Sequence, residues 1–325
     1  MKLSLEKLQY FSKSEKNSLF KIIVWVFMFG SVFYLGYKLF TFNGYSSLLD
    51  EWKSLPPKHF YWLGLVFLLM PLNWLSESIK WKLIVSETQP LSLKNAVKSV
   101  LAGFSTGFFT PNRMGDMVGR LVFLESSNRK TGVTLSLMSS LTQNIIIALC
   151  GIPGAILFFT FQQSEVLKLN NYLIITSIIA VVMIVLFLLV PKLAGRNKNA
   201  AVNEYIKGFA NYSLSKSFLI LFVSLIRFVI FSIQFYAMLR FFGVHLLPGQ
   251  AIAAIPANYL FVTFTPSLAF TEPAIRGSYA VFFIGQFSSH TVGIALAGIG
   301  LWVINYLISM FLGFIVLLKQ TKKEK

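Results

Sequence analysis

The chain has 325 residues, of which 55% are hydrophobic and only 13% charged, and its mean hydropathy is +0.68. About a quarter of the residues of a soluble domain are usually charged, so this composition excludes a soluble enzyme and a disordered chain. The single cysteine, Cys150, excludes a disulfide scaffold, and the three histidines are far apart in sequence. We therefore expect no metal and no other cofactor. The formal net charge of +17 is interpreted against a membrane, where Lys and Arg collect in cytoplasmic loops, and we expect no nucleic-acid partner.

Apolar runs dominate the chain from residue 20 onward. Six of them are long enough to cross about 30 Å of hydrocarbon, and they cover residues 20–40, 60–75, 133–161, 172–190, 218–242 and 292–318. No segment has the composition of a soluble domain or a linker. We therefore expect one membrane domain over residues 1–325, an all-α integral membrane protein built as a multi-pass helical bundle.

Two further apolar stretches, residues 96–124 and 251–286, are broken near their middles by proline and polar residues. The basic residues between spans favour cytoplasmic N- and C-termini in a cell (inner) membrane. With this orientation, the six long spans cross the membrane in alternating directions if both broken stretches are hairpins. The first hairpin then enters and leaves on the cytoplasmic side, and the second enters and leaves on the outer side. Two opposed re-entrant hairpins, one in each half of the chain, indicate an inverted repeat. The alternative is that each stretch is two short crossing helices, which hydropathy alone does not distinguish.

The two breaks share a motif. In each, Phe-Thr-Pro is followed by an acid and, four residues later, by an arginine: Thr110-Pro111 precede Asp116 and Arg120, and Thr265-Pro266 precede Glu272 and Arg276. Because proline removes a backbone donor, we expect the first arm of each hairpin to end near Pro111 or Pro266. A second helix then starts near the acid, and Pro273 suits the first turn of such a helix. An acid and an arginine at i, i+4 lie on one helical face, so each motif predicts an ion pair.

These charges lie within apolar segments, where an ionised side chain costs a few kcal/mol or more and marks a candidate functional site. Arg113 has no acidic partner within its own motif, and we interpret it as the first candidate for a ligand contact. Arg227 lies near the centre of the run 218–242 and should face a cavity or a carboxylate. The predicted substrate-binding set is Arg113, Asp116, Arg120, Glu272, Arg276 and Arg227. The alternative is that these pairs only pin one helix to another.

Other polar residues within the spans are interpreted as structural. Asn73, Glu77 and Lys80 lie toward the cytoplasmic end of their span, and Lys80 is long enough to reach the membrane surface. The run Thr142 to Asn144 is expected to make hydrogen bonds between helices.

The motif residues resemble a known family. Pro111 to Asp116 with Arg120 is similar to the Pro-Gly-Arg-x-Gly-Glu…Arg signature of the membrane domain of lysylphosphatidylglycerol synthases, which flippase-like proteins of uncharacterised family 0104 and the membrane part of an archaeal dolichol-sugar transferase share. The block Pro266 to Gly285 with Glu272 resembles a later element of that family, and Lys80-Trp81 resembles its basic-Trp pair. The chain departs from the pattern at Asp116, where Glu is usual, and at Leu268 to Phe270, where glycines are usual. The resemblance implies a stand-alone member without the aminoacyl-transferase domain.

The resemblance and the buried charges together predict a protein that moves, or flips, an anionic phospholipid or a lipid-linked headgroup across the bilayer. We expect membrane lipids as partners, with an anionic phospholipid or a polyprenyl-phosphate-linked lipid as substrate, and leave homo-oligomerisation open. The chain is not expected to be an enzyme, and no catalytic residue is assigned. Two alternatives remain, an integral membrane transferase acting on a lipid phosphate and a small-solute or ion transporter.

Overall fold

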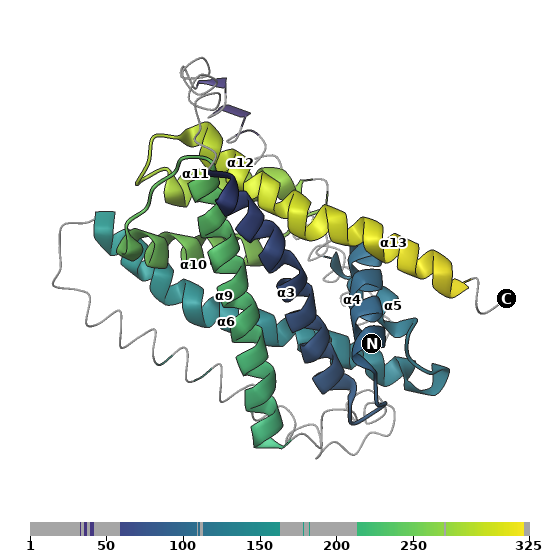
Figure 1. The fold of residues 1–325 in the computed structure, drawn as a ribbon. Helices are drawn as coiled ribbons and strands as arrows, with labels where there is room; N and C mark the ends of the chain where they lie inside the picture. Colours follow the sequence, from purple (N-terminus) through teal and green to yellow (C-terminus); the bar gives the residue numbers. More distant parts are fainter. Residues whose placement is uncertain are drawn as a thin grey trace, which may run out of the picture.

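The structure is a computed structural model, and every regular element among its described residues is helical. It describes residues 59–108, 110, 113–162, 213–269 and 271–321, together with a few isolated positions before residue 42 and at 178 and 182. The predicted spans 20–40 and 172–190, and Pro111, therefore lie outside the described residues. The elements, labelled as in Figure 1, are α3 (Phe60–Val85), α4 (Leu93–Phe108), α5 (Asp116–Leu121), the short η3 (Ser126–Asn128), α6 (Arg129–Gln162), α9 (Leu214–Phe241), α10 (Pro248–Phe264), α11 (Glu272–Ile284), α12 (Thr291–Trp302), the π-helical turn η5 (Val303–Leu307) and α13 (Ile308–Thr321).

Four helical segments of the described part are long and apolar enough to cross a membrane: α3, the segment Ser126–Phe161, α9 and the segment Thr291–Gln320. They correspond to the four predicted spans that fall on described residues. The largest difference in bounds is at α3, which continues ten residues beyond the predicted end at residue 75 to Val85. The polar residues that were expected to end this span are buried and paired inside the bundle, so they do not interrupt the helix.

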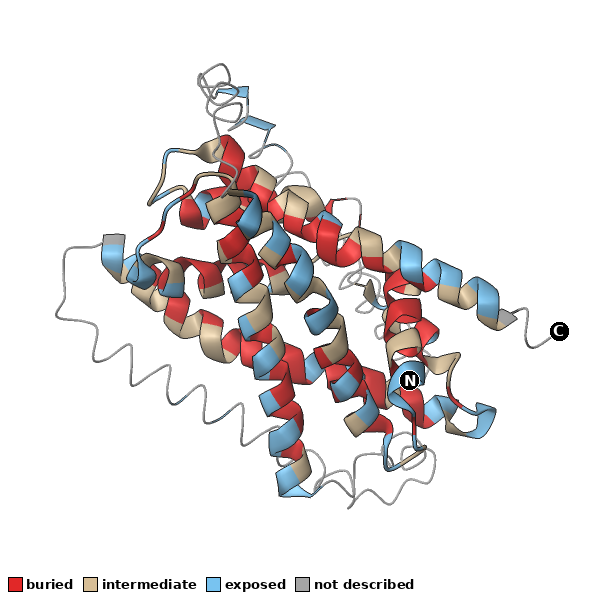
Figure 2. Ribbon diagram, viewed as in Figure 1, coloured by how far each residue is buried: buried red, intermediate tan, exposed pale blue. Residues whose placement is uncertain are grey.

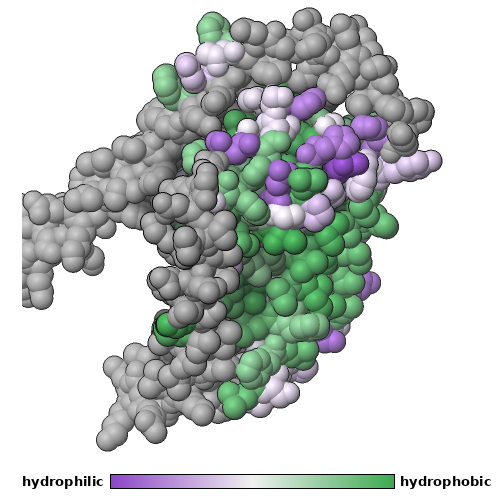
Figure 3. Space-filling view, turned by 90° about the vertical axis from the view of Figure 1, so that its left-hand side faces the viewer, coloured by the Kyte–Doolittle hydropathy of each residue, from purple (hydrophilic) through white to green (hydrophobic). Residues whose placement is uncertain are grey.

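The apolar surface fits a lipid environment. Large hydrophobic side chains are exposed along the outer faces of the long helices, among them Leu68, Leu72, Phe222, Phe311 and Phe314. The space-filling view shows a continuous hydrophobic surface, with hydrophilic residues gathered toward the top of the view (Figure 3). A soluble domain does not expose apolar area on this scale, because it would associate through it. The protein is therefore a multi-pass helical membrane protein.

Helices α3 and α9 pack side by side and run in opposite directions through the centre of the molecule (Figure 1). Their register can be followed along the pair. Phe60 packs edge-on against Phe241 at one end, and the side chain of Lys216 binds that of Glu87 at the other. Since α4 follows the C-terminal end of α3 and α10 follows the C-terminal end of α9, the two broken stretches begin at opposite ends of this pair.

Each predicted break separates two helices. In the first stretch α4 ends at Phe108 and α5 begins at Asp116; in the second, α10 ends at Phe264 and α11 begins at Glu272, with Pro273 in its first turn. The threonine of each Phe-Thr-Pro motif closes the turn. Thr110 Oγ1 accepts a hydrogen bond from the backbone N–H of Gly115 (2.7 Å), and Thr265 Oγ1 donates to Phe261 O (2.7 Å). The prediction that the first arm ends just before the proline is confirmed at Pro266.

Glycine allows the hairpins to pack closely. A Cβ on Gly103 of α4 would overlap the carboxylate of Asp116 in α5, and one on Gly313 of α13 would overlap Leu101 O of α4. Gly151 and Gly154 of α6 lie in the same way against α10. Small residues let helix backbones approach in a membrane, where contact area replaces the hydrophobic effect as the source of stability. Figure 2 accordingly shows the buried residues concentrated along α4, α10 and the inner faces of the long helices.

Candidate functional site

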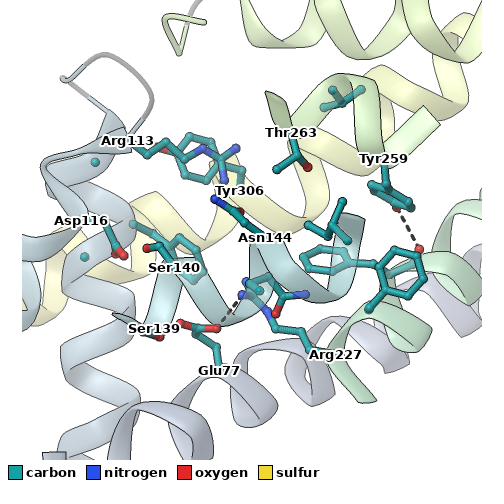
Figure 4. Close-up of a pocket in the computed structure, with 18 of the residues that line it drawn as sticks. Glu77, Arg113, Asp116, Ser139, Ser140, Asn144, Arg227, Tyr259, Thr263 and Tyr306 are labelled. Carbon is teal, nitrogen blue, oxygen red and sulfur yellow. Dashed lines mark hydrogen bonds and ion pairs between the residues drawn. The ribbon is translucent and has the colours of Figure 1, made fainter. Parts of the chain in front are cut away.

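A cavity of about 400 Å³ lies between the two hairpins and the long helices. Its walls come from α3, α4, α5, α6, α9, α10, α11 and the π-helical turn, so residues far apart in sequence meet there (Figure 4). All six predicted substrate-binding residues line it, namely Arg113, Asp116, Arg120, Arg227, Glu272 and Arg276. The same wall also contains Glu77 and Lys80, which the sequence interpretation had assigned to a structural role.

The carboxylate of Glu77 is the centre of one group of charges. It lies 2.8 Å from Lys80 Nζ, 2.9 Å from Arg120 Nη2 and 2.5 Å from Arg227 Nη1, and it accepts a hydrogen bond from Ser139 Oγ (3.1 Å). The exposed fraction of its side chain is 3%, and that of Lys80 is 1%. One buried carboxylate thus holds cations from three different helices.

The expectation that Lys80 reaches the membrane surface is therefore wrong. Its Nζ turns inward and contacts Glu77 and Ser139 O (3.1 Å). The carboxylate of Glu77 compensates the ammonium charge inside the protein, so the side chain does not extend to the membrane surface. The prediction that Arg227 faces a cavity or a carboxylate is confirmed. Its Nε also donates to Asn73 Oδ1 (2.9 Å).

Within each hairpin the predicted i, i+4 ion pair is present. Arg120 Nη2 lies 2.6 Å from Asp116 Oδ2, and Arg276 Nη2 lies 3.0 Å from Glu272 Oε1. Asp116 and Glu272 are the first residues of α5 and α11, where a carboxylate also complements the positive end of the helix dipole. Because Arg120 also binds Glu77, the first of these pairs connects the hairpin to α3.

Arg113 and Glu272 join the two hairpins. Arg113 Nη2 lies 2.6 Å from Glu272 Oε2 and 2.7 Å from Oε1, and Arg113 Nε lies 3.2 Å from Oε2. Arg113 was expected to have no acidic partner within its own motif; its partner lies 159 residues away, where no local motif could reveal it. The exposed fraction of its side chain is 32%, so it is the more accessible member of the pair.

The backbone and neighbours of Arg113 distinguish it further. Its φ of 58° is the left-handed conformation, which among the described residues no other non-glycine residue adopts. Such a conformation costs about 1–3 kcal/mol and persists where the surroundings over-determine it. The guanidinium carbon lies 3.6 Å from the centre of the Tyr306 ring. Figure 4 shows the two side chains next to each other. The Arg113 side chain is thus held between the Tyr306 ring and a carboxylate.

The last residue of α12 and two residues of the π-helical turn Val303–Leu307 present polar groups to the interior. Trp302 Nε1 donates to Glu272 Oε2 (3.0 Å), and the Tyr306 ring covers Arg113. Asn305 accepts a hydrogen bond from Asn73 of α3 and exchanges two with Gln234 of α9. A π-helical turn changes the angular spacing of side chains within a helix, and such turns are frequent at functional sites. Through these residues, this segment contacts both the hairpins and the α3–α9 pair.

Three residues of the cavity wall each have one buried side-chain atom without a hydrogen-bond partner in the structure. These atoms are Arg120 Nη1, Asp116 Oδ1 and Gln143 Oε1. Buried polar groups are nearly always satisfied, so an unpartnered donor and two unpartnered acceptors in one cavity wall call for partners such as water or a polar ligand. Gln143 also fulfils the expected role between helices, since its Nε2 donates to Ser224 O (3.3 Å).

Glu77 is the main residue that sequence reasoning missed. The signal was present, because an acid and a lysine at positions 77 and 80 share one helical face with Asn73. It was discounted because the pair lies close to the polar end of the predicted span. The described residues include no group of three or more His, Cys, Asp or Glu side chains placed to hold a metal ion.

Fold and site together define a helical membrane protein with a buried, positively charged cavity between two helical hairpins. The family model described as the lysylphosphatidylglycerol synthase TM region matches residues 22–313, and the chain belongs to this family. No curated protein and no solved structure matches it significantly.

Proposed function

We propose that the protein translocates a lipid with an anionic phosphate headgroup across the bilayer, and that the headgroup passes through the cavity between the hairpins. The observation that carries the proposal is the Arg113–Glu272 pair beside a cavity with further buried arginines. Guanidinium groups bind phosphate oxygens in bidentate fashion and keep their charge when buried. The membrane lipid is thus the proposed partner, and no chemical conversion is part of the function.

The hairpin arrangement supports alternating access. Helix α5 has six residues and is about 9 Å long, too short to cross about 30 Å of hydrocarbon. Because the two stretches begin at opposite ends of the α3–α9 pair, we propose that they re-enter from opposite membrane faces and form an inverted repeat. In such repeats the substrate site lies where the broken elements meet. Here they meet at Arg113 and Glu272.

The distribution of charge supports an orientation. At the end of the bundle where α4 begins, the described residues include Lys82, Lys94, Arg129, Lys130 and Lys319. At the opposite end they include Arg240 and three histidines. Since lysine and arginine collect on the cytoplasmic side, we propose that the α4 end faces the cytoplasm and that both chain termini lie there.

The proposed binding step exchanges one anion for another. A phosphate that enters the cavity binds Arg113 in place of Glu272, while Arg276 and Trp302 continue to hold the Glu272 side chain. Because Arg113 and Glu272 belong to different hairpins, this exchange loosens the contact between them. The acyl or prenyl chains stay in the bilayer, since only the headgroup needs a polar path.

The test is lipid movement in proteoliposomes. The vesicles contain phosphatidylglycerol with a fluorescent label. Dithionite added outside the vesicles quenches the label in the outer leaflet, so the loss of fluorescence with time measures how much lipid reaches that leaflet. Arg113→Gln should reduce the rate at least about tenfold, as expected for the loss of one charged contact. Arg240→Gln is the matched control, because Arg240 contacts His245 and the Trp62 ring outside the cavity.

Two outcomes would contradict the proposal. Equal rates for wild type, Arg113→Gln and protein-free vesicles would exclude lipid movement through this site. Recovery of the labelled lipid with a new covalent headgroup would instead indicate a transferase. Chromatography of the extracted lipids at the end of each assay distinguishes the two.

A further inference from the structure

The charged side chains that line the cavity form two clusters. In the cluster on the α3 side, Lys80, Arg120 and Arg227 surround Glu77, and Asp116 binds Arg120. Three cations face two carboxylates, so one positive charge is left over. Nothing else charged among the described lining residues belongs to this cluster.

The cluster at the hairpin tips repeats this balance. Arg113 and Arg276 both bind Glu272, two cations to one carboxylate, and a second positive charge is left over. The neutral Trp302 Nε1–H also donates to this carboxylate, so both oxygens of Glu272 already have partners. Among the described residues, Arg113 and Arg276 form no ion pair with a second carboxylate, so a ligand anion can supply the remaining compensation.

An independent observation indicates where ligand atoms can bind. Arg120 is 4% exposed, lines the cavity, and its Nη1 has no hydrogen-bond partner although Nη2 and Nε are both engaged. A buried guanidinium donor without an acceptor is costly in a medium of low dielectric constant. On the other side of the cavity, the Arg113 side chain keeps an exposed fraction of 32%. Arg113 is thus accessible from the cavity, and Arg120 lies in the cavity wall with one guanidinium donor unpaired.

On the basis of the proposed function, we infer that the headgroup is a phosphate group with two negative charges, such as a phosphomonoester, and that it is preferred over the singly charged phosphodiester of a common phospholipid. A dianion neutralises the surplus of two positive charges, one from each cluster. A monoanion leaves one buried positive charge uncompensated, which the surrounding hydrocarbon penalises strongly. The two clusters thus act together as the element that selects the headgroup.

Short-chain lipids test the preference directly. The full chain in a neutral detergent at pH 8 is titrated calorimetrically with dihexanoyl phosphatidate, with geranyl phosphate and with dihexanoyl phosphatidylglycerol. The first two are phosphomonoesters, each with two negative charges, and they differ in the lipid that carries the phosphate. The third is a phosphodiester with one negative charge. At least one monoester should bind about tenfold or more tightly than the diester. Which monoester binds more tightly identifies the carrier as a glycerolipid or a prenyl chain.

Two charge variants provide a second test, because they should change the preference for the dianion in opposite directions. Arg227→Gln removes one positive charge, while Glu77 keeps Lys80, Arg120 and Ser139 as partners, so the preference for the dianion should fall to less than about threefold. Asp116→Asn removes one negative charge and should increase the preference. The pair keeps the proposal testable if one variant fails to fold, and Arg240→Gln should leave the preference unchanged.

Equal or tighter binding of phosphatidylglycerol than of both monoesters would overturn the inference. So would an unchanged preference in a folded Arg227→Gln or Asp116→Asn protein. The proposed function stands or falls separately, because it requires only that phosphatidylglycerol moves across proteoliposomes in an Arg113-dependent way. A protein that moves this lipid without preferring dianions would retain the function and lose the inference.

Discussion

Arg113 and Glu272 connect the tips of two hairpins through a bidentate ion pair with Nη2 to Oε2 and Oε1 distances of 2.6 and 2.7 Å. It directly links the two hairpins at the cavity, and Glu272 shares its oxygens with Arg276 and Trp302. A contact of this kind can be exchanged for a phosphate without unfolding either hairpin. The predictions below follow from it and from the charges around it.

Glu272→Gln should destabilise the protein and slow lipid movement. The substitution leaves the partly buried arginines Arg113 and Arg276 without their carboxylate, and the loss of a charged partner in a partly buried site costs about 1–3 kcal/mol. Trp302→Phe removes only one donor to the same carboxylate and should cost about 1 kcal/mol. Thermal unfolding in detergent measures both. Equal melting temperatures for the two variants would contradict the central role of Glu272.

Glu77→Gln should be more damaging than Lys80→Met. The glutamine leaves Lys80, Arg120 and Arg227 buried beside a neutral amide, whereas the methionine removes one cation and leaves the carboxylate with two arginines. The combination of both changes should be less destabilising than the sum of the single changes, because residues of one charge network are coupled. A double-mutant cycle on unfolding in detergent measures the coupling. Strict additivity would argue against the network.

Gly103→Ala should impair the packing of the first hairpin, while Gly64→Ala should not. A Cβ at position 103 overlaps the Asp116 carboxylate, whereas none of the described residues has an atom within 4 Å of a Cβ at position 64. In an exposed helical position the same change favours the helix by up to about 1 kcal/mol. We expect a lower melting temperature and slower lipid movement for the first variant and an equal or higher melting temperature for the second. A tolerated Gly103→Ala would mean that α5 shifts freely away from α4.

His245 should make the α3 N-terminal end of the bundle sensitive to pH. Burial, together with the charge of the neighbouring Arg240 and of His59 and His290, lowers the pKa of His245 below its ordinary value. Because the unfolded chain then takes up a proton before the folded chain does, this contribution to stability is complete above a pH of about 6.5 and declines as the pH falls below it. Arg240→Gln should raise the pKa of His245, which an NMR titration of the imidazole resonances measures. A pKa that falls or stays constant in this variant would contradict the assigned cause.

Local patterns in the sequence predicted the parts of the site that lie within one helix. The pairs Asp116–Arg120 and Glu272–Arg276 follow from i, i+4 spacing, and the helix break before Pro266 follows from the missing backbone donor. The membrane class and the four spans that fall on described residues follow from the length of apolar runs. All of these depend on residues within a few turns of one another. The chemistry of neighbouring residues is therefore sufficient to predict them.

Only the tertiary structure decided which charges share a partner. Arg113 binds a glutamate 159 residues away, and Glu77 binds Arg227 from a helix 150 residues further along the chain. Within a membrane, each charge takes the nearest opposite charge that packing allows, and packing depends on which helices lie side by side. Composition and spacing thus determined that buried charges exist and where the helices break. The helix arrangement determined that these charges form one cavity with more positive than negative groups.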